Sequence, residues 1–352
     1  MTDPVPGPLN LITDVAGLSV GGAEDSALRT GVTVLLADRQ VPAAADVRGG
    51  GPGTRETEAL RPEGSVAALD AVVLSGGSAL GLGAADAVAD ALSRRGRGVS
   101  LFPDHPTVPI VPAAILYDLG PHLAAAFAAE GPPHRALARA ALEAAGARFA
   151  LGSHGAGRGA RAGRLKGGLG SASLVLPGAA ADGGPLTVGA LVAANPVGSV
   201  VMPGGRAFWA WPFELEHAGR PEFGGLRPDM AEAGRAAEPL PDESRLGAAA
   251  RPGGATVIAA VATDATLDAA GCLRLAIAAQ DGIARAVRPA HTPMDGDTVF
   301  ALATGRREAA GPRPLALARL GAAAADCLAR AIARAVFEAR SCSGEAPAWA
   351  DC

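Results

Sequence analysis

Apolar and polar positions follow two different periods along the chain, which predicts a mixture of strands and helices. Short apolar or β-branched runs bounded by polar residues or glycines predict strands at residues 9–15, 31–36, 70–74, 170–176, 187–194, 256–262 and 298–303. Longer stretches with apolar positions three or four residues apart predict helices at residues 79–95, 133–147, 267–287 and 314–340. Strands interspersed with helices in this way indicate a layered α/β protein.

Residues 226–254 interrupt this pattern. The stretch consists mainly of Pro, Gly, Ala, Glu and Arg without clear periodicity, and it leads directly into the apolar strand that begins at Thr256. Such a long irregular stretch inside a compact chain is usually functional or disordered. We interpret it as a linker that ends at the first residue of a core strand. The residues from Ser341 onward are expected to be frayed.

The composition excludes several classes of protein. Hydrophobic residues make up 49% and charged residues 19% of the 352 positions, which excludes global disorder. A net charge of −4 excludes a broad basic surface for nucleic acid. Apolar stretches end before the ~18 residues that suggest a membrane-spanning helix, and the first ten residues lack a signal-peptide pattern. We therefore expect a cytoplasmic protein with neither nucleic acid nor a membrane as partner.

Cysteine spacing argues against metal and disulfide chemistry. The four cysteines form no CxxC pair and have no histidines at ligand spacing; they lie at positions 272, 327, 342 and 352. We expect no metal site. The glycine-rich segments 48–55 and 75–83 complete neither a phosphate-binding loop nor a nucleophile elbow. The second is interpreted as a turn, and the first fits either an anion-binding loop or a tight turn.

Some residue types are scarce enough to indicate special positions. Lys166 is the only lysine among thirty arginines, Tyr117 is the only tyrosine, and Asn195 is one of two asparagines. A lone lysine suggests a site that requires a compact ammonium group, although a chance occurrence is the alternative. Asp295 and Asp297 lie on the same side of an extended segment. They would anchor an ammonium group or share a proton, unless they form a solvated turn.

Thr256 would gain a reactive group if the peptide bond before it were cut. A free α-amine has a pKa of about 7.7–8.0, so it can act as a base near neutral pH beside the threonine hydroxyl. The position of Thr256, at the end of the linker and the start of a strand, suits such a cut.

Five segments resemble, in order, the motifs of one family. They are DVRGGGPGT at 46–54, LSGGSA at 74–79, LKGGLG at 165–170, VATDA at 261–265 and RPAHTPMDGDT at 288–298. Together they look like the DmpA-like family of self-processing N-terminal-nucleophile hydrolases. This family includes L-aminopeptidase D-amidase/D-esterases, β-peptidyl aminopeptidases and nylon-oligomer hydrolases. The resemblance runs from about Leu11 to the last predicted helix.

The resemblance implies a fold and a processing event. The fold is a four-layer αββα sandwich, shared with ornithine acetyltransferases, and residues 1–352 form one such domain. The precursor is cut between Ala255 and Thr256 into an α segment, residues 1–255 with the linker 226–254, and a β segment, residues 256–352. Thr256 then becomes the nucleophile.

The same resemblance implies the remaining site residues. The family's lysine, asparagine and tyrosine fall on Lys166, Asn195 and Tyr117, and its acidic pair on Asp295 and Asp297. Tyr117 would bind the substrate and the others would take part in catalysis. The expected substrate is a small peptide or amide, no metal or organic cofactor is required, and the processed units form a homo-oligomer.

The sequence departs from the family pattern at three positions. Ala255 stands where many relatives have asparagine, Gln280 and Gly22 where histidines are common. Alanine still supplies the carbonyl that is attacked, so self-cleavage remains expected at an undetermined rate. The alternatives are an acyltransferase of the ornithine acetyltransferase type and an uncut, non-enzymatic member of the fold.

Overall fold

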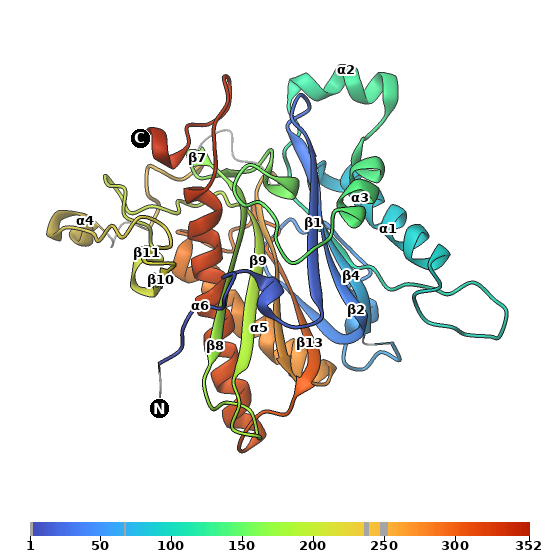
Figure 1. Ribbon diagram of the computed structural model, residues 1–352. Helices are drawn as coiled ribbons and strands as arrows, with labels where there is room; N and C mark the ends of the chain where they lie inside the picture. Colours follow the sequence, from blue (N-terminus) through green and yellow to red (C-terminus); the bar gives the residue numbers. More distant parts are fainter. Residues whose placement is uncertain (1–2, 67, 236–238, 247–252) are drawn as a thin grey trace.

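Two β-sheets that share one long strand form the centre of the structure (Figure 1). The computed structural model describes residues 3–66, 68–235, 239–246 and 253–352. The strands are β1 (Leu18–Asp25), β2 (Thr30–Val47), β3 (Thr54–Arg55), β4 (Ala68–Ser75), β5 (Ala113–Ile115), β6 (Arg161–Ala162), β7 (Leu165–Lys166), β8 (Gly168–Leu176), β9 (Leu186–Asn195), β10 (Glu216–His217), β11 (Arg220–Pro221), β12 (Thr256–Ala265) and β13 (Thr298–Arg307). The α-helices are α1 (Gly83–Arg94), α2 (Pro121–Glu130), α3 (His134–Glu143), α4 (Met230–Arg235), α5 (Ala269–Ala286) and α6 (Arg313–Phe337).

Hydrogen bonding between the strands runs in the order β3-β5-β4-β2-β13-β12-β9-β8, and β1 also pairs with β2. Strand β2 belongs to both sheets, because residues 32–36 pair with β4 whereas residues 43–47 pair with β13. Strand β12 lies between β13, to which it is parallel, and β9, to which it is antiparallel. It therefore occupies the middle of one sheet, with neighbours on both edges.

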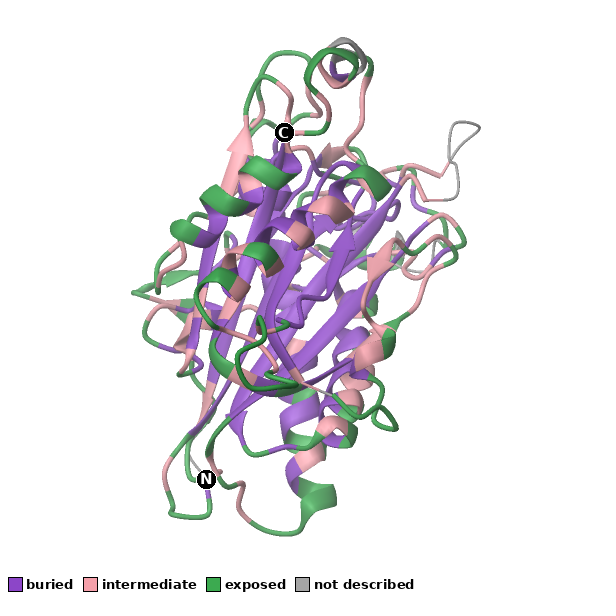
Figure 2. Ribbon diagram, turned by 90° about the vertical axis from the view of Figure 1, so that its right-hand side faces the viewer, coloured by how far each residue is buried: buried purple, intermediate pink, exposed green. Residues whose placement is uncertain are grey.

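Alternation along β12 explains the layers. Successive side chains of a strand point to opposite faces. Val257, Ala259 and Val261 belong to a buried cluster shared with α5 and α6. The intervening Ile258 and Ala260 belong to a second cluster, which lies between the two sheets. A third cluster packs α1 and α3 against the other sheet, so the order of layers is helices, sheet, sheet, helices (Figures 1 and 2).

The predicted strands and helices mostly agree with this structure. Six predicted strands lie within β2, β4, β8, β9, β12 and β13, and the four predicted helices overlap α1, α3, α5 and α6. The strand predicted at residues 9–15 is wrong, because Ile12–Asp14 form a 3-10 helix. The Asp14 side chain accepts hydrogen bonds from the backbone nitrogens of Leu9 and Leu11, which bends the chain there.

Two irregular stretches are more ordered than expected. The predicted linker contains α4, although residues 236–238 and 247–252 lie outside the described part of the chain. The end of the chain is not frayed, because Trp349 is buried, stacks on Phe208 and donates from Nε1 to the Arg206 carbonyl at 3.0 Å.

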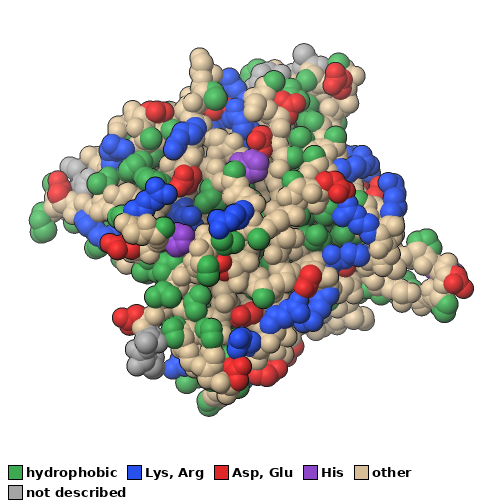
Figure 3. All heavy atoms as spheres, viewed as in Figure 1, with side chains coloured by type: hydrophobic (Ala, Val, Ile, Leu, Met, Phe, Trp, Pro, Cys, Tyr) green, Lys and Arg blue, Asp and Glu red, His purple; other side chains and the backbone are tan. Residues whose placement is uncertain are grey.

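Figure 3 shows basic and acidic side chains interspersed over one face of the molecule.

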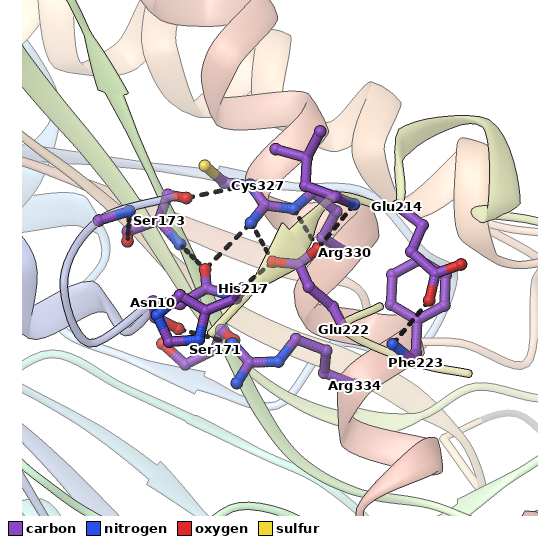
Figure 4. A network of polar contacts seen from close by, with 12 residues as sticks. Asn10, Ser171, Ser173, Glu214, His217, Glu222, Phe223, Cys327, Arg330 and Arg334 are labelled. Atoms are coloured by element: carbon purple, nitrogen blue, oxygen red, sulfur yellow. Dashed lines mark hydrogen bonds and ion pairs between the residues drawn. The ribbon is translucent and has the colours of Figure 1, made fainter. Parts of the chain in front are cut away.

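A buried ion pair connects α6 to distant parts of the chain (Figure 4). Arg330 Nε donates to Glu222 Oε2 at 2.7 Å, and Arg330 Nη2 donates to Asn10 Oδ1 at 3.0 Å. Burial alone would raise the pKa of Glu222, but the hydrogen bond and charge of Arg330 hold it below the usual value. Arg330 lies in the predicted β segment, and Asn10 and Glu222 lie in the predicted α segment.

Replacing Arg330 with alanine is expected to destabilise the fold strongly. The substitution leaves the Glu222 carboxylate buried without its ion-pair partner, and such losses cost about 3–5 kcal/mol. Because the folded-state pKa of Glu222 is lowered, its contribution to stability is complete above its unfolded pKa and is lost as the pH falls through the folded value. Urea denaturation at neutral and acidic pH measures both effects. Equal stability of the variant and the wild type at neutral pH would contradict this view.

Candidate active site

Thr256 is the first residue of β12 and faces Asn195, the last residue of β9. Only 3% of Thr256 is exposed, and its Oγ1 is buried without a hydrogen-bond partner among the described residues. Gly296 N donates to the carbonyl oxygen of Ala255 at 3.2 Å. Since buried polar atoms are normally paired, an unpaired hydroxyl next to a held carbonyl marks this peptide bond as unusual.

The acidic pair lies directly against this peptide bond. Asp297 Oδ1 accepts from Val257 N at 2.7 Å, and Asp297 Oδ2 lies 2.8 Å from His291 Nδ1. Asp295 forms a β-bridge with Ala255. Both carboxylates are almost fully buried, so the solvated turn considered from the sequence is wrong. Burial and the charge of Asp297 raise the pKa of Asp295.

The glycine-rich segment 48–55 packs against the acidic pair. Gly51 N donates to the Asp295 carbonyl at 2.8 Å. A Cβ on Gly49, which has a φ of 151°, would lie 2.4 Å from the same carbonyl oxygen. The glycines therefore allow close backbone approach, so this segment is a packed turn.

Substituting Asp297 with asparagine is expected to impair both self-cleavage and turnover. The carboxylate accepts from Val257 N with one oxygen and from His291 with the other, and an amide can accept with only one of these positions. Hydrogen bonds to charged groups are worth about 1.5–3 kcal/mol, which corresponds to roughly 10- to 100-fold in rate. Time courses of cleavage and hydrolysis measure the loss. The control is Asp182→Asn, which loses an exposed ion pair with Arg307 and should behave as wild type. Wild-type rates in Asp297→Asn would show that the Asp297 carboxylate takes part in neither reaction.

Asn195 and Tyr117 meet at a cavity of about 740 Å³, which Ala255 also lines. Asn195 Nδ2 donates to the Tyr117 carbonyl at 3.3 Å, and Asn195 Oδ1 accepts from Arg161 N at 2.9 Å. The Tyr117 side chain is exposed at the cavity. The structure thus brings Tyr117, Asn195 and the bond between Ala255 and Thr256 to one place.

Lys166 is the last residue of β7, two positions before β8 begins, and is 2% exposed. Its Nζ donates to the Arg158 carbonyl at 2.6 Å and lies 3.5 Å from Glu345 Oε2. Burial lowers the pKa of Lys166, while Glu345 raises it. Within the described part of the chain, the polar contacts of the ammonium group go to these residues and none goes to Thr256.

Sequence reasoning missed two residues at the cavity. Arg245, from the predicted linker, donates from Nη2 to the Asn195 carbonyl at 2.8 Å, and burial lowers its pKa to about 10. Asp118 accepts from Gly77 N at 2.7 Å, and burial raises its pKa to about 6. Both line the cavity. Arg245 lies in a stretch without periodicity, so the sequence gives no sign that it is buried. Asp118 directly follows Tyr117, which the sequence singled out, and that adjacency could have indicated it.

Neither a metal cluster nor a membrane-spanning helix is found among the described residues. They contain no cluster of His, Cys, Asp and Glu suited to a metal ion. None of their helices combines the length and apolar character needed to cross a membrane.

Known proteins are similar to this chain in sequence and in fold. The sequence profile of peptidase family S58 matches residues 10–348. An uncharacterized aminopeptidase of Mycobacterium leprae (strain TN) is 43% identical over 357 residues, which cover 96% of this chain and 92% of the relative. A 6-aminohexanoate-oligomer endohydrolase of Paenarthrobacter ureafaciens is 30% identical over 299 residues, which cover 83% of this chain and 74% of the relative.

Two solved structures are also similar. A Burkholderia sp. beta-aminopeptidase has a TM-score of 0.69 and 25% identity, and the match covers 99% of this chain and 92% of that one. The L-aminopeptidase D-Ala-esterase/amidase from Ochrobactrum anthropi, described as a variant of the Ntn hydrolase fold, has a TM-score of 0.67 and 23% identity. The match covers 100% of this chain and 94% of that one. The second likeness shows the fold alone, and it agrees with the four layers expected from the sequence.

Proposed function

Because the chain belongs to peptidase family S58 and is a hydrolase of peptide or amide bonds, we propose that it cuts itself between Ala255 and Thr256 and then uses Thr256 as its nucleophile. The observation that carries this proposal is the buried Oγ1 of Thr256, which has no hydrogen-bond partner in the described part of the chain and lies beside a carbonyl that accepts from Gly296 N. The substrates are small peptides or amides.

Self-cleavage proceeds through an ester. Thr256 Oγ1 attacks the Ala255 carbonyl carbon, the C–N bond breaks, and the acyl group moves to oxygen. The proton of the hydroxyl passes to the nitrogen, which becomes the free amine of Thr256. Water then hydrolyses the ester and releases the carboxylate of Ala255. The hydrogen bond from Gly296 N polarises the carbonyl that is attacked.

Hydrolysis of substrate uses the same atoms. The free α-amine of Thr256, assisted by Lys166, takes the proton from Oγ1, which attacks the substrate carbonyl carbon. The amide C–N bond then breaks, the proton passes to the leaving amine, and an acyl-enzyme ester remains for water to hydrolyse. Asn195 Nδ2 donates to the developing oxyanion, a contribution of roughly 2.7–4 kcal/mol for one donor. Asp295 and Asp297 orient the new amine, and Tyr117 contacts the substrate in the cavity. Water completes the cycle.

The relatives support a substrate with a free amino group, since their names describe aminopeptidases and an enzyme of 6-aminohexanoate oligomers. We also expect the processed units to assemble as a homo-oligomer in the cytoplasm.

The mass of freshly purified protein tests the proposal. We expect two fragments, residues 1–255 and 256–352, and the smaller should begin Thr-Val-Ile-Ala-Ala on N-terminal sequencing. An active enzyme that remains one chain of 34.7 kDa, or a small fragment with another first residue, would remove Thr256 as nucleophile.

A further inference from the structure

Residues 341–352, here called the closing segment, fold back over Lys166. Lys166 N donates to the Pro347 carbonyl at 2.8 Å. Arg29 Nη1 donates to the Gly344 carbonyl at 2.9 Å, which attaches the segment to a second part of the chain. Together with the buried Trp349, these contacts fix the closing segment across the place where the only lysine lies.

Glu345 is the charged residue that this segment brings to Lys166. Its Oε1 lies 2.6 Å from Arg158 Nη1, and its Oε2 lies 3.5 Å from Lys166 Nζ. The three side chains are 4%, 6% and 2% exposed for Glu345, Arg158 and Lys166. Buried charges require a partner, and among the described residues Glu345 is the only carboxylate that forms an ion pair with Lys166.

We propose that Glu345 is a positioning residue for the hydrolytic reaction, because it holds the Lys166 ammonium group in place and controls its proton affinity. This inference rests on the proposed function, in which Lys166 assists Thr256. Glu345 lies in the β segment and Lys166 in the α segment, so the contact crosses the proposed division of the chain.

Several groups face the Lys166 ammonium group from different elements. Glu345 and Cys342 belong to the closing segment, Arg158 follows the 3-10 helix Gly155–Gly157, and Asp118 follows β5. Burial and Arg158 lower the pKa of Lys166, and Glu345 opposes both. Removing the charge of Glu345 should therefore move the pKa of Lys166 further down.

The scarcity of lysine permits a direct test. A protein labelled with ¹³C at lysine, with a lysine-free tag, gives one lysine Cε resonance, and its titration reports Lys166 alone. In Glu345→Gln the midpoint should move to lower pH. On the high-pH plateau, where Lys166 is neutral in both proteins, kcat should fall roughly 10- to 100-fold, as expected for a displaced catalytic group, with KM little changed. The pH profile of kcat should shift in the same direction, and Glu345→Asp should recover part of both effects.

Asp351→Asn is the matched control. Asp351 lies in the closing segment, is exposed, and accepts from Ala348 N at 3.2 Å. This variant should keep the wild-type resonance and rate. An unchanged midpoint in Glu345→Gln, or a shifted midpoint with wild-type kcat, would overturn the proposal. So would a lower kcat with an unchanged pH profile, because that result indicates a purely structural role. If the wild type neither cuts itself nor hydrolyses amides, the proposed function fails instead, and the resonance distinguishes the two cases because it needs no turnover.

Discussion

Thr256→Ala is expected to remain one uncut, inactive chain of normal fold. The substitution removes the hydroxyl that attacks in both self-cleavage and hydrolysis. Because Oγ1 has no hydrogen-bond partner among the described residues, no hydrogen bond within the described structure is lost, and the uncut chain should still unfold in one cooperative thermal transition. Intact mass, an amide-hydrolysis assay and thermal unfolding measure the three outcomes.

Two variants sharpen this result. Thr256→Ser keeps the hydroxyl but loses the methyl group that restricts χ1, so it should retain part of both reactions. Thr263→Ala makes the same change as Thr256→Ala farther along β12, where Thr263 Oγ1 donates to the Thr187 carbonyl at 3.0 Å; it should cut itself and turn over normally. A Thr256→Ala chain that separates into two fragments would disprove the mechanism.

The sequence predicted the elements whose burial is regular. Strand β12 has buried residues on both faces, and its β-branched start made it easy to recognise. Strand β1 was missed because Gly21 and Gly22 interrupt the apolar pattern. A Cβ on Gly21 would lie 1.9 Å from the Ala141 carbonyl oxygen. The close packing of α3 therefore requires glycine at this position, and glycine hides the apolar alternation by which a strand is recognised.

The candidate site was predictable where chemistry is local. Asp295 and Asp297 lie two residues apart, and in the structure both are buried beside the bond between Ala255 and Thr256. Arg245 and Glu345 reach the site through contacts with distant parts of the chain. They lie in segments without periodicity, where only tertiary packing decides which side chains turn inward. The catalytic roles themselves remain predictions.

Lys166→Arg is expected to lower turnover by roughly 10²–10⁴-fold, the usual contribution of general acid–base catalysis. Arginine keeps the charge but is effectively never deprotonated in proteins, and its planar group replaces a compact ammonium. The wild-type Lys166 is 2% exposed, and burial lowers its pKa, so its neutral form becomes available at lower pH than in a free lysine.

Activity that depends on the neutral amine should therefore rise with pH and level off below the usual lysine range in the wild type, and this rise should be absent from Lys166→Arg. Steady-state rates across pH measure both effects. Arg164→Lys makes the reverse exchange at an exposed position two residues away and should leave rate and profile unchanged. Wild-type turnover in Lys166→Arg would show that the position needs only a positive charge, and the role of a neutral Lys166 in assisting proton transfer to the Thr256 amine would then be wrong.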